Sequence, residues 1–259
     1  MSELHLWKVV LDARALSAFA REQGLLHRSI DQGYLVHAAL AAVFGERAPK
    51  PFVIERSLSP DALGVQDGLV SECVLAYSEH TLEGKWAARE HAHLVQWERS
   101  GSKQVPTIAE GSRLGFITRV MPTVRTHAAT PGHPAHGRGE GREIDAFLAE
   151  CFRVGESVKV DRAAVYHDWL ARHMKGAEMS FCGAELEDYS LRAFQRIQLM
   201  RKERSGGAGR KRHVLERPDA VITGTLRVMD EAAFRALLAR GIGRHRAFGF
   251  GMLLMLRAE

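Results

Sequence analysis

The order in which apolar patterns follow one another along the first half of this chain most constrains its fold. Alternating or β-branched runs predict strands, and apolar residues every three to four positions predict helices. The expected segments are a strand at 4–11, helices at 13–23 and 31–44, strands at 52–58 and 69–77, a helix at 81–97 and a strand at 113–124. This order, β-α-β-β-α-β, is typical of a ferredoxin-like unit, in which two helices cover one face of an antiparallel sheet.

The second half repeats this organisation with additions. We expect helices at 143–152, 162–174 and 230–240, and strands at 185–203, 214–229 and 252–256. The stretch between the halves is rich in His, Pro and Gly and poor in large apolar residues, which indicates a linker or exposed loop. The sequence therefore predicts an α+β chain of two tandem ferredoxin-like (RRM-like) domains with antiparallel sheets. Residues 1–125 form the first domain, 126–142 the linker, and 143–259 the second domain, with a helical insertion after the linker.

Charge and cysteine content narrow the class of protein. A formal net charge of +5 permits an anionic partner without requiring one. Three widely separated cysteines without metal-binding spacing favour a reducing compartment. Nothing approaches the roughly 20 consecutive apolar residues of a membrane span. We expect a cytoplasmic protein without a membrane partner.

Three histidines in the expected linker are the candidates for a metal site. His127, His133 and His136 have no cysteine or carboxylate at ligand spacing beside them. A solvated loop is the simpler interpretation, so the sequence predicts neither a metal nor another cofactor.

A basic, glycine-rich stretch lies between the last expected helix and the last expected strand. Glycine has no Cβ and adopts positive φ readily, so such a backbone can approach a ligand closely. The candidate residues for binding a phosphate backbone here are Gly241, Gly243, Arg244, His245, Arg246, Gly249 and Gly251. A nucleotide-using enzyme is the weaker alternative, because a Rossmann or P-loop glycine run follows a strand and opens a helix.

A second basic stretch lies between the two long strands expected at 185–203 and 214–229. Its residues predict the tip of a β-hairpin, and its cations would bind phosphates with salt-dependent affinity. A solvated turn is the alternative. The residues are Arg201, Lys202, Arg204, Arg210, Lys211 and Arg212.

The tail GIGRHRAFGFGMLLM resembles the glycine-rich C-terminal signature of the RAMP superfamily of CRISPR proteins, and most closely the CasE-type endoribonucleases. Other segments agree in order, namely 80–82, 102–103, 113–116, 122–125 and 165–172. The resemblance implies tandem ferredoxin-like domains that bind the hairpin of a CRISPR repeat, or the crRNA, in a basic cleft. It also implies metal-independent cleavage on the 3′ side of the hairpin, a 2′,3′-cyclic phosphate product, and other subunits of a ribonucleoprotein effector complex as partners. A type IV counterpart also fits.

CasE-type proteins carry a Tyr-x-x-His pair near the first helix, and Tyr34 and His37 match it here. Histidine suits proton transfer near neutral pH, and tyrosine can hold or protonate an oxygen. His27, beside Arg28, is the competing candidate. If Tyr34 and His37 only pack, the chain is instead a non-catalytic crRNA-binding subunit. The catalytic interpretation requires that the pair and the tail meet in one cleft.

Overall fold

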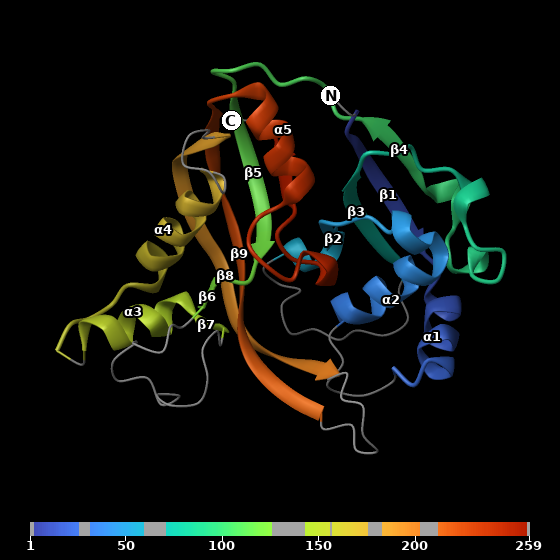
Figure 1. The fold of residues 1–259 in the computed structure, drawn as a ribbon, viewed down its shortest axis with the longest axis horizontal. Coiled ribbons are helices and arrows are strands. Elements are labelled where there is room, and N and C mark those ends of the chain that lie inside the picture. Colours follow the sequence, from blue (N-terminus) through green and yellow to red (C-terminus); the bar gives the residue numbers. More distant parts are fainter. Residues whose placement is uncertain are drawn as a thin grey trace.

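The computed structural model describes residues 3–25, 32–59, 71–125, 143–155, 157–175, 183–202 and 212–257. They form two four-stranded antiparallel sheets that lie side by side, each with helices packed against it (Figure 1). The α+β class and the tandem ferredoxin-like architecture are confirmed.

The first unit contains the strands β1 to β4, in the spatial order β2-β3-β1-β4. This is the ferredoxin-like order, because the first and third strands lie side by side in the middle. Two helices connect β1 to β2, and the Asp12 carboxylate caps the first of them by accepting the N–H groups of Arg14 and Ala15. The elements are β1 (His5–Leu11), α1 (Ala13–Glu22), α2 (Gln32–Phe44), β2 (Phe52–Ile54), β3 (Glu72–Ser78) and β4 (Gly101–Gln104).

The second unit has the same topology, with the strand order β10-β5-β9-β8. Along the sequence, the helices α3 and α4 come between the first two strands of this sheet, β5 and β8, and α5 comes between the last two, β9 and β10. A small two-stranded sheet, β6 with β7, precedes α3. The elements are β5 (Arg113–Val120), β6 (Thr123–Arg125), β7 (Glu143–Asp145), α3 (Ala146–Val154), α4 (Arg162–Met174), β8 (Ala184–Lys202), β9 (Arg212–Val228), α5 (Glu231–Arg240) and β10 (Leu253–Leu256).

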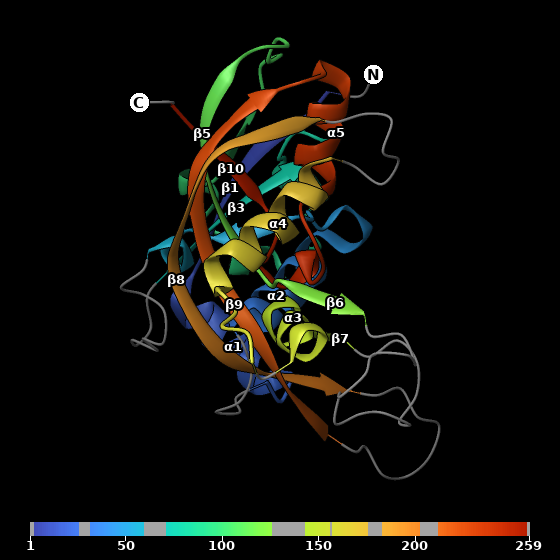
Figure 2. The same ribbon diagram turned by 90° about the vertical axis from the view of Figure 1, so that its left-hand side faces the viewer.

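The strands β8 and β9 are much longer than the rest of their sheet. They pair from Ala184–Val228 to Lys202–Arg212, and the register shifts at two points. Figure 2 shows that α4 covers the part of this hairpin that belongs to the sheet, while the other end bends away and projects below the body of the protein. The expected basic hairpin is therefore present as a projecting arm.

Each unit has its own hydrophobic core, and the two units also pack on each other. Trp7, Leu40 and Phe52 are fully buried in the first core, and Trp169 and Phe234 in the second. Residues of the first unit extend into the second core; the Tyr77 hydroxyl, for example, donates to the Leu253 carbonyl oxygen at 3.1 Å. Burial of this hydroxyl raises its pKa. A polar contact at such depth fixes the two units relative to each other.

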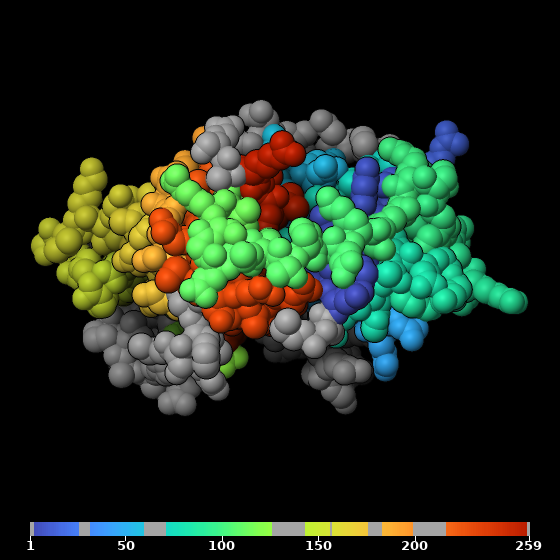
Figure 3. Space-filling model, turned by 90° about the horizontal axis from the view of Figure 1, so that it is seen from above, coloured from blue at the N-terminus to red at the C-terminus, as the bar shows by residue number. Residues whose placement is uncertain are grey.

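The connection between the units is not where the sequence predicted it. β5 was expected to close the first domain, but it pairs with β9 and β10 of the second sheet. Residues 105–112 cross from one unit to the other over the top face, shown in green in Figure 3. Residues 126–142, the expected linker, join β6 to β7 and lie outside the described residues. We infer that the first unit ends before β5 and not at residue 125.

The prediction of a helix at 81–97 is wrong. Three 3₁₀ turns occupy this stretch, at Gly84–Trp86, Ala92–Leu94 and Trp97–Arg99. The chain around Leu94 instead pairs with the end of β1, since the Asp12 amide donates to the Leu94 carbonyl oxygen at 2.9 Å. The fourth strand of the unit is β4, which was missed because all its residues are exposed and polar.

Smaller differences concern element ends. The strand expected at 52–58 stops at Ile54 and continues as a 3₁₀ turn, and the helix expected from 143 begins at Ala146. Asp230 caps α5, since its carboxylate accepts the Ala233 N–H at 2.6 Å. Within the described residues, no helix is long and apolar enough to cross a membrane.

Candidate active site

The helix α2 carries the Tyr34 and His37 side chains. It is almost entirely apolar, with Val36, Leu40 and Val43 in the first core. Because Tyr34 and His37 are three positions apart, they lie on one face of the helix. Both side chains are partly buried. The helix is therefore a fixed element from which two polar groups reach the surface.

The glycine-rich stretch forms a closed loop between α5 and β10. The Ile242 amide donates to the Gly251 carbonyl oxygen at 2.7 Å, which joins the two ends of the loop. The Gly251 amide donates to the Arg119 carbonyl oxygen at 2.7 Å, which ties the loop to β5. The Arg119 guanidinium lies over the Phe250 ring at 4.4 Å and forms a bidentate ion pair with the buried Asp219. A rigid, buried base thus supports the loop.

The glycines of this loop are required by packing inside the protein. A Cβ on Gly251 would lie 2.1 Å from the Ile242 carbonyl oxygen, and one on Gly243 would lie 2.8 Å from the Trp169 ring. A Cβ on Gly241 would lie 2.7 Å from the Gly251 carbonyl oxygen. The space that glycine leaves open is filled by protein at these positions. Packing inside the protein therefore accounts for glycine at these three positions without a ligand, and their contact with RNA stays a prediction.

The loop and α2 meet through Phe248. Its ring stacks on Tyr34 with centroids 5.9 Å apart and meets the His37 ring edge-on at 5.2 Å. The His245 ring is 6.2 Å away on the loop side. The loop also approaches α2 closely at Gly249, where a Cβ would lie 3.9 Å from the Gly33 Cα. The two sequence features expected to share a cleft therefore lie together.

The environment of His37 favours the neutral imidazole. Burial lowers its pKa below the ordinary value, and the nearby positive charge of Lys50 lowers the pKa further. A neutral imidazole can accept a proton near pH 7. The arrangement therefore provides a base beside a phenol, with a cation near enough to act on the base through its charge.

The cations of the loop are engaged with other groups of the protein. The carboxylate of Glu143, on β7, accepts a hydrogen bond from the Arg244 guanidinium and lies 3.0 Å from His245 Nε2. The bond to His245 is the largest cause, and with Arg244 it lowers the pKa of Glu143 to about 2. The Arg246 guanidinium donates to the Arg240 carbonyl oxygen at the end of α5, where a positive charge is favourable.

The remaining predicted site residues lie either outside the described residues or on the arm. His27, Arg204, Arg210 and Lys211 lie outside the described residues, as do the three linker histidines. Arg201, Lys202 and Arg212 lie on the paired ends of β8 and β9, and only their backbone is described. The described structure thus brings together α2 and the glycine-rich loop and places the basic hairpin on a separate arm.

Sequence reasoning missed the roles of three residues of this region, Lys50, Glu143 and Phe248. Phe248 lies within the tail signature, and an aromatic residue between glycines is a recognisable signal of a specific contact. Lys50 and Glu143 carry no local signal, because their neighbours in space come from distant parts of the chain.

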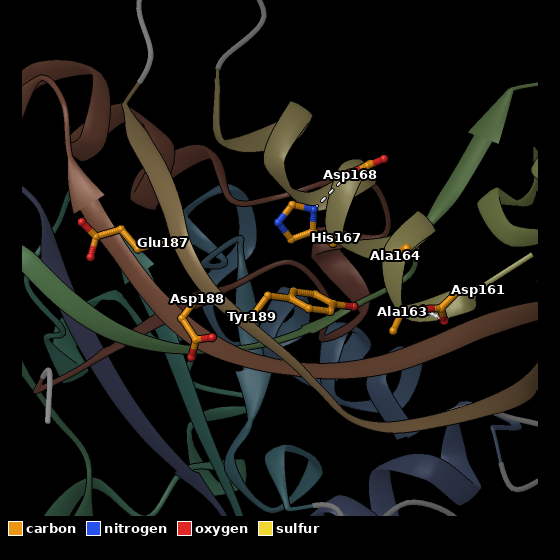
Figure 4. A pocket seen from close by; sticks show the side chains of 8 residues that line it. All are labelled: Asp161, Ala163, Ala164, His167, Asp168, Glu187, Asp188 and Tyr189. Carbon is orange, nitrogen blue, oxygen red and sulfur yellow. Dashed lines mark hydrogen bonds and ion pairs between the residues drawn. The ribbon is translucent and has the colours of Figure 1, made fainter.

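A separate hollow of about 380 Å³ lies between α4 and β8 (Figure 4). Four carboxylates line it, and the rings of His167 and Tyr189 meet edge-on there at 5.4 Å. An RNA backbone would be repelled by these carboxylates. Among the residues that the structure describes, no group of three or more His, Cys, Asp or Glu side chains is arranged to hold a metal ion. The lining residues are Asp161, Ala163, Ala164, His167, Asp168, Glu187, Asp188 and Tyr189.

Comparison with known proteins gives matches over nearly the whole chain. The model of a family described as "CRISPR associated protein" matches residues 4–257. Among solved structures, "CRISPR endoribonuclease Cse3 bound to 19 nt RNA" has a TM-score of 0.61 and 18% identity, covering 98% of this chain and 99% of that chain. "CRISPR-associated protein Cas6e from Escherichia coli str. K-12" has a TM-score of 0.53 and 18% identity, covering 98% and 100%. A chain from a "CRISPR RNA-guided surveillance complex" has a TM-score of 0.50 and 17% identity, covering 98% and 100%.

Two further matches cover only part of the chain. Ninety-three residues are 31% identical to "Protein dispatched homolog 3" of Gallus gallus, which is 34% of this chain and 7% of that protein. The protein of the same name from Mus musculus is 30% identical over a stretch of the same length. The chain spans only 7% of the length of these curated relatives. A likeness of this extent carries no argument about activity.

Proposed function

Because this chain belongs to the CRISPR-associated protein family, we propose that it is an endoribonuclease that binds the hairpin of a CRISPR repeat and cuts the precursor transcript on the 3′ side. The observation that carries the proposal is the meeting of α2 with the glycine-rich loop through Phe248. This places a base and a phenol beside a structured loop. The RNA-bound endoribonuclease with which the chain shares its fold supports the same activity.

The proposed chemistry is an attack of the RNA on itself. His37, held neutral by its surroundings, removes the proton of the 2′-hydroxyl group. The 2′-oxygen then bonds to phosphorus, the bond to the 5′-oxygen breaks, and a 2′,3′-cyclic phosphate remains. Tyr34 donates a proton to the departing 5′-oxygen. Lys50 supplies positive charge to the phosphorane. These steps require no metal ion.

RNA binding is assigned to the projecting arm and to the loop. The basic residues at and beyond the paired ends of β8 and β9 would contact stem phosphates. An A-form stem is recognised mainly by shape and backbone, which suits an arm that reaches away from the body. If the arm holds the stem after the cut, the product stays bound. The protein would then join an effector complex in the cytoplasm as its crRNA-bound subunit.

The test is cleavage of a 5′-labelled RNA with the repeat of the same CRISPR locus, in excess EDTA, at single turnover. His37→Ala should slow cleavage by roughly 10²-fold or more while RNA affinity persists. His167→Ala is the matched control, because His167 also meets an aromatic ring edge-on, at 5.4 Å against 5.2 Å, but lies in the acidic hollow.

Two results would contradict the proposal in different ways. Undiminished cleavage by His37→Ala would move the base elsewhere, with His27 as the next candidate. Absence of cleavage by the unaltered protein, with tight binding of the repeat, would favour a non-catalytic crRNA-binding subunit. An upstream product that ends in a 3′-hydroxyl group, with the phosphate on the 5′-oxygen of the other fragment, would exclude attack by the 2′-oxygen.

A further inference from the structure

Glu143 is the residue on which the basic groups of the glycine-rich loop converge. Its carboxylate accepts a hydrogen bond from Arg244 and lies 3.0 Å from His245 Nε2. A third basic group, Arg217 on β9, has its Nε 3.9 Å from the same carboxylate. The Glu143 side chain is only 17% exposed. One carboxylate from β7 thus ties the loop to an element outside it.

The contact acts on the most constrained residue of the loop. His245 has φ 60° and ψ 24°, and it is the only non-glycine residue in the described part of the chain with positive φ. Such a conformation costs free energy and persists only where the surroundings enforce it. The Glu143 carboxylate holds the side chain of this residue, and the His245 carbonyl oxygen accepts the Phe248 N–H at 2.8 Å.

Two short steps therefore connect Glu143 to the candidate active site. Glu143 fixes His245, and His245 fixes the turn that carries Phe248. The Phe248 ring in turn packs against Tyr34 and His37. A change at Glu143 would reach the proposed catalytic pair through the loop, without any contact between Glu143 and RNA.

We propose that Glu143 is a positioning residue for RNA cleavage, which holds the glycine-rich loop so that Phe248 orients Tyr34 and His37. The proposal rests on the endoribonuclease function proposed above. Since a carboxylate repels phosphates, Glu143 contributes to the rate of cleavage and not to RNA affinity. In this respect Glu143 differs from the cations of the same cluster, which attract phosphates.

The charges of the cluster favour positioning over blocking. Two arginines, Arg217 and Arg244, face a single carboxylate, so the cluster keeps a positive charge with Glu143 in place. The Arg244 side chain is 42% exposed while bound to Glu143. A phosphate can therefore approach this cation from solvent without displacing the carboxylate.

The decisive variant is Glu143→Gln, which keeps the size of the side chain and removes its charge. We expect the single-turnover rate on the labelled repeat RNA to fall roughly 10- to 100-fold, because small displacements of reacting groups are costly. RNA affinity should be unchanged or tighter. The matched control is Glu187→Gln. Its side chain is similarly exposed, at 18%, and its carboxylate is held by Arg113 on β5 and Arg227 on β9 at 2.6 and 2.7 Å.

Two further variants distinguish positioning from a general structural role. Glu143→Asp keeps the charge and should recover part of the lost rate. In a background that lacks both groups of the pair, Tyr34→Phe with His37→Ala, Glu143→Gln should have little additional effect on the residual rate, because its route to the chemistry passes through these two residues. If Glu143→Gln lowers the cleavage rate by the same factor with and without the catalytic pair, the proposal is overturned. It is also overturned if Glu143→Asp cleaves no faster than Glu143→Gln. A faster rate in Glu143→Gln would do so as well, since it would make the carboxylate an inhibitory contact.

A measurement without RNA separates this inference from the proposed function. Amide hydrogen exchange of residues 241–251 should be faster in Glu143→Gln and unchanged in Glu187→Gln. If the unaltered protein does not cleave RNA, the endoribonuclease function fails, and exchange still decides whether Glu143 holds the loop. If the protein cleaves and Glu143→Gln is fully active, the positioning role fails and the function stands.

Discussion

The two units share one topology and differ in the segment that joins their third strand to their fourth. In the first unit, three short 3₁₀ turns lead from β3 to β4, an exposed edge strand. In the second, the helix α5 and the glycine-rich loop lead from β9 to β10, which is half buried. The first unit supplies the polar pair on α2, and the second supplies the loop that packs on it.

This difference assigns separate tasks to the two units. The sheets are scaffolds of the same kind, and the connections between strands carry the chemistry. Tyr34 and His37 both belong to the first unit, but the Phe248 ring that both residues contact comes from the second unit. The comparison predicts that changes in the loop of the second unit alter the behaviour of residues in the first.

Glycine substitution gives the largest expected effect on stability. Gly251→Ala in the second unit would force a Cβ to 2.1 Å from the Ile242 carbonyl oxygen at φ +77°. We expect a loss of about 3 kcal/mol from strain and clash together, which lowers Tm by roughly 6–12 °C. Gly24→Ala in the first unit, at φ +62° with open space around it, should cost about 1–2 kcal/mol. Thermal unfolding measures both, and equal losses would show that the loop is not tightly packed.

The sequence predicted elements whose own residues determine them. The helix α4 was predicted with its observed bounds, because apolar residues such as Tyr166, Trp169 and Leu170 recur at helical spacing. The prediction of a helix at 81–97 was wrong although this stretch contains Leu82, Trp86 and Leu94 as candidate apolar contacts for a helix. These side chains belong to the first core, but the backbone there turns repeatedly and then pairs with β1. Pairing with a distant strand leaves no periodic signal in the sequence.

Replacing the shared aromatic ring gives the next largest effect. Phe248→Leu removes the ring that contacts Tyr34 and His37 and keeps an apolar side chain. We expect the single-turnover cleavage rate to fall roughly tenfold because the pair loses its fixed orientation, with RNA affinity little changed. Tyr189→Leu, which removes the ring beside His167, should leave the rate unaltered. A Phe248→Leu protein with the full rate would show that α2 orients its pair without the second unit.

The candidate site was predictable in part. The spacing of Tyr34 and His37 places both on one helical face, and the family resemblance pointed to this pair. The meeting of α2 with the loop was a hypothesis that the geometry supports. The role of the glycines could not be predicted, because the Trp169 ring that fills the space beside Gly243 comes from another helix.

The smallest expected change is the shift of the pH profile when the Lys50 charge is removed, which comes in addition to the loss of rate from the less stabilised phosphorane. Burial is the main cause of the lowered His37 pKa, and the Lys50 charge adds to it. The acid limb of the rate profile should therefore lie below pH 6.5. Lys50→Met should move this limb upward but leave it below pH 6.5, because burial, the larger cause, remains.

Linkage determines the sign of the accompanying change in stability. A folded-state pKa below the unfolded value gives His37 a stabilising contribution that is present above pH 6.5 and is lost as the pH falls through the folded pKa. Lys50→Met should weaken that pH dependence of stability while shifting the rate profile. Single-turnover rates and unfolding midpoints measured from about pH 5 to pH 8 test both. An acid limb that stays in place in Lys50→Met would show that burial alone sets the proton affinity of His37, and a limb that moves to lower pH would contradict the stated effect of the Lys50 charge.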